Sequence, residues 1–268
     1  MKNLIKKLLG ADGTDDSKGF GMTDPGLRRE NNEDAFAVLA DRNIYIVADG
    51  MGGHNAGEVA SVEAIRVLET YFTRELVDSL SADKNTASGH MNQAFLDASR
   101  SIYEMAKADP SMKGMGCTLI MAFLSGNQLH TCHIGDVRCY VCGPSGIEQV
   151  GNDHSQVWDL VRAGQLTPEQ ARKHPHKNIL TQAVGQRAAL APEYHCREVQ
   201  PKERVLLCSD GLWDMLSDED IRSIVMRHRR PKAACRELVE QANKAGGKDN
   251  ITVVVFGAGD PGENDFDE

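Results

Sequence analysis

The sequence predicts an α+β fold in which antiparallel strands are layered against helices. Residues 118–124 form an apolar run that is followed by a Ser-Gly-Asn turn and by a further strand from Gln128, which is the pattern of a hairpin. The strand pattern continues as a meander to residue 150, which argues against a regular alternation of strand and helix. We therefore favour layered antiparallel sheets over a doubly wound parallel sheet.

The other elements follow from the spacing of apolar residues. Strands are expected at 43–48, 118–124, 204–209 and 251–256, where apolar residues run on without interruption. Helices are expected at 58–76, 90–107, 155–163, 168–173, 217–228 and 231–245. The helix over 58–76 has the clearest pattern, because Val62, Ile65 and Leu68 recur at steps of three and Phe72 and Leu76 follow at steps of four.

Composition excludes several classes of protein. Apolar residues make up 41% of the 268 residues and charged residues 26%, which is typical of a soluble globular protein. No apolar run approaches the roughly 18 residues that span a bilayer, so stable membrane insertion is not expected. The net charge of −9 leaves no basic face for nucleic acid. Seven scattered cysteines do not suggest a disulfide framework, and we predict a reducing cytoplasm and a monomer.

The chain is expected to hold one folded domain between two short ends. Residues 1–19 form an N-terminal extension and linker, in which Met1–Gly10 has the spacing of a short amphipathic helix. This segment is either a frayed terminal helix without a role or a docking or membrane-surface element. Residues 20–258 contain no internal repeat or long linker and are expected to fold as one domain. Residues 259–268 form an acidic tail, most simply a solvated, disordered end, with an interaction role as the alternative.

Two strand ends carry the same pair of residues. The strands that lead to Asp49-Gly50 and to Asp210-Gly211 both place a carboxylate at the end of the strand, beside a glycine. Glycine lets the backbone approach a ligand closely, so the carbonyl of Gly50 can act as a further oxygen donor.

Four further acids stand at comparable junctions. They are Glu33 and Asp34 in an Asn-Glu-Asp sequence, Asp136 in a Gly-Asp turn, and Asp249 just before the last strand. Carboxylates that converge repel one another unless a cation neutralises them, and ligands that are all oxygen select Mg²⁺ or Mn²⁺ over Zn²⁺. The sequence therefore predicts a divalent-metal site, with an ordinary turn as the alternative for any single Asp-Gly pair.

Two other side chains suit phosphate chemistry at such a site. His54 follows Asp49 in a glycine-rich loop, and a histidine with a pKa near neutrality can protonate a leaving oxygen as a general acid. Arg29 precedes Glu33 by four residues, and a guanidinium can bind a phosphate group through two hydrogen bonds. A structural histidine and a surface arginine are the alternatives.

Three competing motifs fail on inspection. A dinucleotide-binding loop from Gly50 would need a glycine where Asn55 stands. The spacing of Cys132 and Arg138 matches a cysteine phosphatase, but an acid lies between them and a strand follows instead of a helix. Cys139 and Cys142 would point to opposite faces of a strand, so this pair is not expected to hold zinc.

Six segments together resemble the metal-dependent Ser/Thr protein phosphatases of type 2C, in particular the compact bacterial form. They are RENNED (29–34), VADGMGGH (47–54), GMGCTL (114–119), HIGDVR (133–138), LCSDGLWD (207–214) and GKDNIT (247–252). The resemblance covers roughly residues 19–257. It implies a four-layer α-β-β-α sandwich with two central antiparallel sheets, and a centre of two Mn²⁺ or Mg²⁺ ions between them.

The resemblance also implies a role for each site residue. Asp49 would bridge the two ions, Gly50 and Glu33 would complete one of them, and Asp210 and Asp249 the other. In the same way, Asp136 would help to hold a third, weaker ion, Asp34 would orient metal-bound water, Arg29 would clamp phosphate, and His54 would be the general acid. Residues 152–185 match a flap that borders the site.

Two residues depart from the family pattern. Cys117 stands where the family usually has Thr, and Val137 where it usually has Ser. Neither change removes a metal ligand, but both fall near the place of the third ion.

The expected activity is hydrolysis of phosphoserine and phosphothreonine in proteins by in-line attack of a hydroxide that bridges the metals. By resemblance, the enzyme would oppose a Hanks-type Ser/Thr kinase in a bacterial cytoplasm. A catalytically silent module that binds phosphoproteins or senses metal is the main alternative, and a metal-dependent hydrolase of small phosphoesters is another.

Overall fold

Ten strands form two antiparallel sheets in the part of the chain that the computed structural model describes, which is residues 18–52, 56–80, 84–186 and 189–257. The first sheet has the order β1 (Gly19–Asp24), β10 (Ile251–Gly257), β9 (Arg204–Cys208), β6 (Arg138–Gly143) and β7 (Gly146–Val150). The second has the order β2 (Asp34–Leu39), β3 (Ile44–Met51), β4 (Gly116–Ser125), β5 (Gln128–Ile134) and β8 (Glu193–Glu198). The antiparallel sheets predicted from the hairpin and meander are confirmed.

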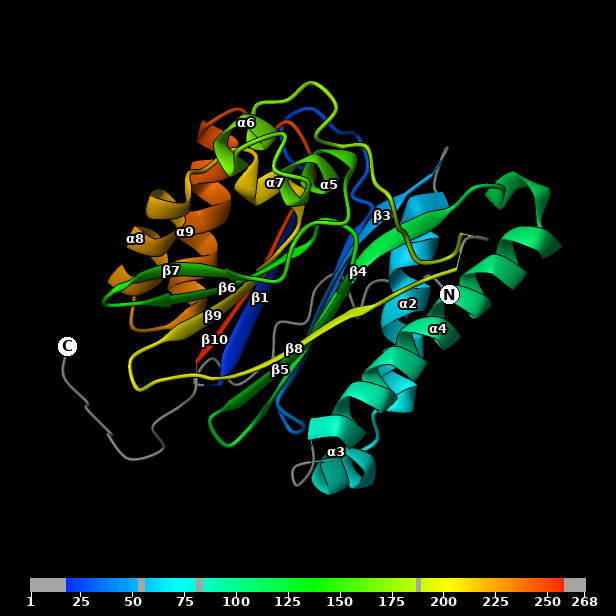
Figure 1. Cartoon of the computed structure of the whole chain (residues 1–268), viewed down its shortest axis with the longest axis horizontal. Coiled ribbons are helices and arrows are strands. Elements are labelled where there is room, and N and C mark those ends of the chain that lie inside the picture. The colour runs from blue at the N-terminus through cyan, green and yellow to red at the C-terminus, as the bar shows by residue number, and fades with distance from the viewer. Residues whose placement is uncertain (1–17, 53–55, 81–83, 187–188, 258–268) are drawn as a thin grey trace.

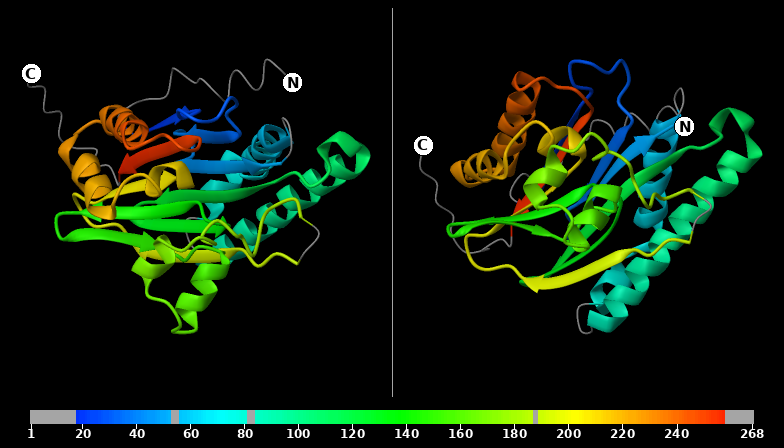
Figure 2. Two further views of the ribbon diagram at one scale, coloured as in Figure 1. Left: turned by 90° about the horizontal axis from the view of Figure 1, so that it is seen from above. Right: turned by 45° about the horizontal axis from the view of Figure 1, so that its top comes forward.

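Helices cover the outer face of each sheet (Figure 1). The second sheet is covered by α2 (Ala56–Tyr71) and α4 (Lys84–Ala108), with α3 (Arg74–Leu80) between them in the chain. The first sheet is covered by α8 (Asp218–Arg227) and α9 (Pro231–Lys244). Figure 2 shows α4 and α9 on opposite sides of the pair of sheets. The four-layer α-β-β-α sandwich is therefore confirmed.

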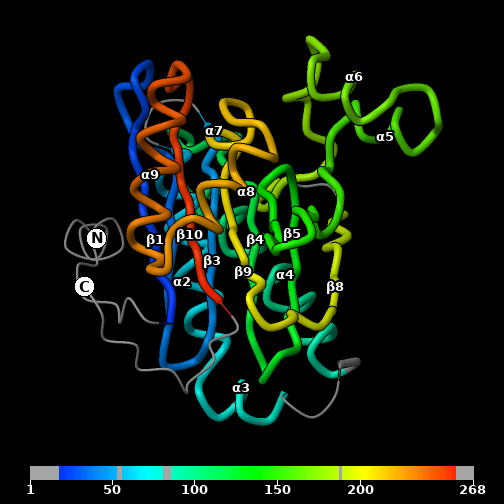
Figure 3. The backbone as a smooth tube through the Cα atoms, turned by 90° about the vertical axis from the view of Figure 1, so that its left-hand side faces the viewer, coloured from blue at the N-terminus to red at the C-terminus, as the bar shows by residue number. Residues whose placement is uncertain are grey.

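Short elements complete the described structure. They are a 3-10 turn at Pro110–Met112, α5 (Gln156–Arg162), α6 (Pro168–Arg172) and α7 (Asp210–Trp213). Figure 3 shows α5 and α6 standing out from one end of the sandwich, above β5 and β8.

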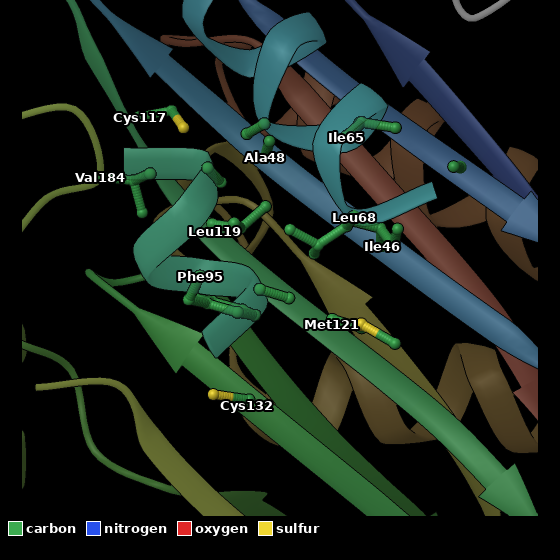
Figure 4. Close-up of a cluster of buried hydrophobic side chains, with 14 of the residues drawn as sticks. Ile46, Ala48, Ile65, Leu68, Phe95, Cys117, Leu119, Met121, Cys132 and Val184 are labelled. Atoms are coloured by element: carbon green, nitrogen blue, oxygen red, sulfur yellow. The ribbon is translucent and has the colours of Figure 1, made fainter. Parts of the chain in front are cut away.

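Three clusters of buried apolar side chains fill the spaces between the layers. One lies between the second sheet and its helices and contains Phe95, Leu119 and Met121 (Figure 4). A second lies under α8 and α9, and the third lies between the two sheets. Cys142 belongs to the second cluster and Cys139 to the third, so these two thiols do lie on opposite faces of β6.

The predicted helix over 58–76 is wrong in one respect, because the structure has two helices there. The first ends at Tyr71, and the second begins at Arg74. The Thr73 hydroxyl accepts a hydrogen bond from the Leu76 amide at 3.3 Å, which is the geometry of an N-terminal cap. The apolar spacing runs through this junction without a change, because both helices pack on the same core.

Candidate functional site

Asp34 and Asp49 lie directly opposite each other at one end of the second sheet. They are paired in the antiparallel register of β2 and β3. The Gly50 amide donates a hydrogen bond to the Glu33 carbonyl at 3.1 Å, which holds the start of β2 against the end of β3. Sequence neighbours on two strands therefore bring Glu33, Asp34, Asp49 and Gly50 to one place.

Asp210 and Asp249 reach the same place from the first sheet. Asp210 begins α7, with Ser209 between it and the end of β9, and Asp249 stands shortly before β10, the strand paired with β9. The side-chain carbonyl of Asn250 accepts a hydrogen bond from the Glu33 amide at 2.8 Å, which joins the two sheets. Ser209 joins them a second time, because its hydroxyl donates to Asp34 Oδ2 at 2.7 Å.

Asp136 lies in the turn by which the chain passes from the second sheet to the first, between β5 and β6. It is buried, and its backbone carbonyl accepts a hydrogen bond from the indole Nε1 of Trp213 at 3.1 Å. Trp213 closes α7, the helix that begins with Asp210. This contact fixes Asp136 beside the Asp210 segment.

The electrostatics show that these carboxylates share one environment. Burial raises the pKa of Asp49 well above its usual value, and the nearby Asp34, Asp210, Asp136 and Asp249 raise it further. Burial likewise raises the pKa of Asp210 well above its usual value, and the nearby charges of Asp136 and Asp249 raise it further. The structure thus brings together the acids that the sequence analysis singled out.

Two neighbouring acids have smaller shifts. Burial raises the pKa of Asp136 to about 7, with a further contribution from Asp153, while Arg138 lowers it. Burial raises the pKa of Asp34 to about 6, although the hydrogen bond from Ser209 lowers it. Burying several acids close together is unfavourable unless their charge is neutralised, and strongly shifted pKa values of this kind are typical of functional sites. Binding a cation is the simplest function that would neutralise them.

The donor set fits hard divalent cations. Asp34 Oδ1 and Asp210 Oδ1 are buried and have no hydrogen-bond partner among the described residues. Gly50 must be a glycine, because a Cβ there would lie 2.2 Å from the Gly57 carbonyl oxygen and 2.5 Å from that of Glu33. Carboxylate oxygens without protein donors, gathered at one point, match the ligand preference of Mg²⁺ and Mn²⁺.

Arg29 lies at the rim of this cluster. Its Nη2 donates to Asp249 Oδ2 at 2.7 Å, and about half of its side chain, 51%, is exposed. The guanidinium is therefore held at the cluster but is accessible from solvent, as a phosphate-binding group must be. His54 lies outside the described residues, as do the amphipathic segment 1–10 and the acidic tail.

Residues 152–185, called the flap below, border this end of the molecule and are tied to it by ion pairs. Lys177 pairs with Asp214, which follows α7. Arg172 Nη1 pairs with Asp218 at 2.9 Å, and its Nη2 donates to two backbone carbonyls in the same segment. The flap therefore docks on the segment that follows Asp210.

Sequence reasoning missed the residues that support the acids. Ser209 and Asn250 each stand next to a predicted ligand, and that adjacency is a signal which could have found them. The buried pair of Arg138 and Asp153, with Nη2 and Oδ2 2.7 Å apart, has no comparable signal, because 15 residues separate its members.

The two residues that depart from the family pattern, Val137 and Cys117, are both buried. Val137 is buried in the apolar cluster between the sheets, where a valine packs well. Cys117 is also buried, and burial raises the pKa of its thiol, so the thiol stays protonated.

Comparison with known proteins gives a consistent result. Residues 28–251 match the family model described as protein phosphatase 2C. The protein phosphatase PhpP of Streptococcus pneumoniae is 36% identical over 237 residues, which cover 87% of this chain and 94% of PhpP. The serine/threonine phosphatase stp of Listeria monocytogenes is 34% identical over 236 residues, which cover 87% of this chain and 92% of stp.

Solved structures agree with the sequence relatives. The serine/threonine phosphatase Stp1 from Staphylococcus aureus has a TM-score of 0.81 at 30% identity, with 89% of this chain and 94% of that chain covered. The catalytic domain of the serine/threonine protein phosphatase PstP, in complex with two manganese ions, has a TM-score of 0.78 at 34% identity, with 90% and 97% covered.

Proposed function

This chain belongs to the protein phosphatase 2C family and is a protein serine/threonine phosphatase, and from that premise we propose that its carboxylate cluster holds the divalent cations on which hydrolysis depends. The observation that carries the proposal is the convergence of Asp49, Asp210 and Asp136. Burial raises the pKa of all three, the charges of Asp210 and Asp136 also raise the pKa of Asp49, and the charge of Asp136 raises that of Asp210. The alternative of a silent binding module gains no support from this arrangement, because the acids are present and gathered.

We assign the cations, Mn²⁺ or Mg²⁺, to the following ligands. Asp49, Glu33 and the carbonyl of Gly50 would hold one ion, and Asp49, Asp210 and Asp249 would hold the other. Asp136 would help to hold a third ion. When bound, the ions supply a water of lowered pKa as nucleophile for in-line attack on phosphorus. The two manganese ions in the PstP neighbour support the assignment of the first two ions.

The remaining residues bind the substrate and move its protons. Arg29 binds phosphoryl oxygens through its guanidinium, exchanging its bond to Asp249 for bonds to the phosphate. Asp34 accepts a hydrogen bond from Ser209 through one carboxylate oxygen and so keeps the other directed at water in the cluster. His54 donates a proton from its imidazole to the departing serine or threonine oxygen.

The cellular role follows from the same assignment. Residues 20–258 act as one catalytic domain, and the substrates are phosphoproteins in the cytoplasm that a Hanks-type Ser/Thr kinase has modified. The relatives are phosphatases from bacteria, which supports this setting. None of the described helices is long and apolar enough to cross a membrane.

The experiment that tests the proposal is release of phosphate from a phosphothreonine peptide, with and without Mn²⁺. The wild type is compared with Asp210→Asn and with the control Asp78→Asn, which changes an exposed acid on α3. We expect release that needs Mn²⁺, that is lost in Asp210→Asn and that is kept in Asp78→Asn. Release by Asp210→Asn at the wild-type rate would refute the metal assignment.

A further inference from the structure

A cluster of histidine and glutamate side chains lies at the edge of the second sheet and includes no residue of the carboxylate cluster. His133 on β5 and Glu193 on β8 are direct partners in the antiparallel register, and His195 follows two residues along β8, on the same face. His154, from the loop after β7, stacks its ring on His133 with centroids 4.7 Å apart. One potential ligand atom from each of His133, His154 and Glu193 lies within 4.8 Å of the others.

The hydrogen bonds indicate which imidazole nitrogen carries a lone pair. His133 Nε2 lies 2.9 Å from the Asn152 carbonyl oxygen, and only a protonated nitrogen can donate to a carbonyl. The Nδ1 of neutral His133 therefore carries a lone pair. His154 is the opposite case, because its Nδ1 accepts from the Gly135 amide at 3.2 Å. Its proton is on Nε2, which lies 3.3 Å from Glu193 Oε2.

Glu193 is the charged member of the cluster. Its pKa is held well below the usual value, first by the hydrogen bonds from His154 and His195, so the carboxylate is ionised at neutral pH. The second oxygen, Oε1, lies 2.7 Å from His195 Nε2. Each oxygen of the Glu193 carboxylate thus accepts a hydrogen bond from an imidazole, and the imidazole of His133 lies within reach of the same carboxylate.

Gly151 lies against both of these imidazoles. A Cβ on this residue would lie only 2.8 Å from His133 Cε1, and it would lie 3.2 Å from His195 Nε2 and 3.3 Å from His133 Nδ1, so the close approach of both rings requires a glycine. Its φ of +89° also favours glycine. His133 Nδ1 and His195 Nε2 therefore both lie close to one point beside Gly151.

We propose that His133 Nδ1, the Glu193 carboxylate and His195 Nε2 bind one Zn²⁺ ion at a site separate from the Mn²⁺ or Mg²⁺ centre. Two imidazoles and one carboxylate, with water in the fourth position, form a donor set typical of zinc, whereas Mg²⁺ and Mn²⁺ prefer oxygen ligands. The proton on His195 Nε2 moves to Nδ1 when the metal binds. His154 is not a ligand, because its Nδ1 accepts from the Gly135 amide and so keeps the proton on Nε2, which donates to Glu193. It acts as the outer partner that orients the carboxylate.

The site joins two parts of the molecule that otherwise meet through hydrogen bonds. Glu193 and His195 belong to the edge strand β8, and His133 is bonded to Asn152, where the flap begins. The backbone amide of His154 also donates to the Gly135 carbonyl at 2.8 Å. A bound cation would therefore link β5, β8 and the base of the flap, and would stabilise the folded state by mass action.

The test uses Co²⁺ as a spectroscopic probe for Zn²⁺, on metal-stripped full-length protein saturated with Mg²⁺. Tetrahedral Co²⁺ with nitrogen ligands absorbs visible light far more strongly than octahedral Co²⁺ with oxygen ligands, so the two centres are distinguishable without an activity assay. We expect one intense Co²⁺ site per chain, from which added Zn²⁺ displaces the Co²⁺. The double variant Glu193→Gln/His195→Asn should bind at least about a hundredfold more weakly, because it loses two ligands.

A second His–Glu pair provides the matched control. His228, just after α8, is hydrogen-bonded through Nε2 to Glu237 on α9, and neither residue belongs to β8 or to the flap. The double variant His228→Gln/Glu237→Gln should therefore leave the intense Co²⁺ absorption unchanged. Zn²⁺ at a hundredfold excess over its dissociation constant should raise the melting temperature of the wild type and of this control by about 5–10 °C, but not that of the β8 variant.

Two results would overturn the proposal. One is a wild type that shows only the weak absorption of oxygen-ligated Co²⁺, and the other is a β8 double variant that keeps the intense absorption. If the double variant does not fold, as judged by circular dichroism, His195→Asn alone decides the question. His195 is partly exposed on an edge strand, so this single change should fold, and it should weaken Co²⁺ binding by at least about tenfold.

Discussion

Ser209 connects the two sheets at the carboxylate cluster, because its hydroxyl donates to Asp34 Oδ2 at 2.7 Å while its oxygen accepts from the Thr252 amide at 3.0 Å. One small buried side chain thus satisfies an acid on β2 and a backbone donor on β10. The acids of the two sheets depend on this bond for their relative placement.

Removing that hydroxyl should therefore cost stability. We expect Ser209→Ala to lower the free energy of unfolding by about 1–3 kcal/mol, because it leaves the Thr252 amide and Asp34 Oδ2 without their partner in a buried place. Urea denaturation of metal-stripped protein measures this change. Ser79→Ala, which removes an exposed hydroxyl from α3, should have little effect, and an equal loss in both variants would count against a special role for Ser209.

The raised pKa values predict how stability depends on pH without metal. Folded-state pKa values of about 6 for Asp34 and about 7 for Asp136 exceed the usual value near 3.8, so the folded protein binds protons more tightly than the unfolded chain. Metal-stripped protein should therefore become more stable as the pH falls from about 8 to about 5. For either acid, each pKa unit by which the folded state exceeds the unfolded chain changes the free energy of unfolding over this pH range by up to about 1.4 kcal/mol.

Cations should reverse this trend. Binding requires deprotonated carboxylates, so saturating Mn²⁺ should add most stability at the higher pH and little near pH 5. Thermal denaturation at a series of pH values, with and without Mn²⁺, measures both curves. Parallel curves would mean that these acids are not the ligands.

Much of this site was predictable because its acids lie in short local patterns. Asp49, near the end of β3, and Asp210, two residues after the last residue of β9, each follow an apolar run and precede a glycine, and both strand ends reach one point. Their supporting contacts were not predictable, because cross-strand register decides them. Glu193 meets His133 only because β8 pairs with β5, and 60 residues of chain separate the two.

In the fold, too, the elements with clear local sequence patterns were predicted and the others were missed. Apolar strands such as β9 and β10 were predicted almost to their ends, because both faces are buried and their residues form unbroken runs. The edge strand β8, with the sequence EYHCRE, was missed because it is only half-buried and mostly polar. Strands β1 and β2 were also missed, and β1 has glycines at two of its six positions.

The flap should depend on its ion pair to the segment after Asp210. Lys177 and Asp214 are both largely buried, with 25% and 16% of their side chains exposed, and we expect Lys177→Met to weaken docking by about 1 kcal/mol. The population with an undocked flap would then rise about fivefold, which limited proteolysis within residues 152–185 detects. Lys173→Met, an exposed change in the same flap, is the control and should leave the cleavage rate unchanged.

His54 provides a kinetic prediction. If its imidazole protonates the leaving oxygen, His54→Ala should slow hydrolysis of a phosphothreonine peptide by about 10²–10⁴. An aryl phosphate needs little protonation of its leaving group and should be affected far less. Mn²⁺ affinity, followed by titration, should stay the same. Equal losses on the two substrates would remove the general-acid role.

Arg29 should act on substrate binding through the geometry of its guanidinium. Its Nη2 is bonded to Asp249 at the rim of the carboxylate cluster, and the side chain is half exposed. We expect Arg29→Ala to raise KM for a phosphothreonine peptide by about 10–100-fold, the equivalent of 1.5–3 kcal/mol for hydrogen bonds to a charged group. Arg29→Lys should recover only part of this loss, because an ammonium cannot bind two phosphate oxygens in one plane.

The adjacent arginine separates this local contact from general electrostatic attraction. Arg28 is exposed and carries the same charge one residue away, so Arg28→Ala removes the same net charge from the loop. If Arg29 binds phosphate directly, steady-state kinetics at about 0.15 M salt should show little change in KM for Arg28→Ala, because that salt screens exposed charges beyond about 8 Å. If the two variants raise KM equally, the loop attracts the substrate through its overall charge, and Arg29 is not the phosphate ligand.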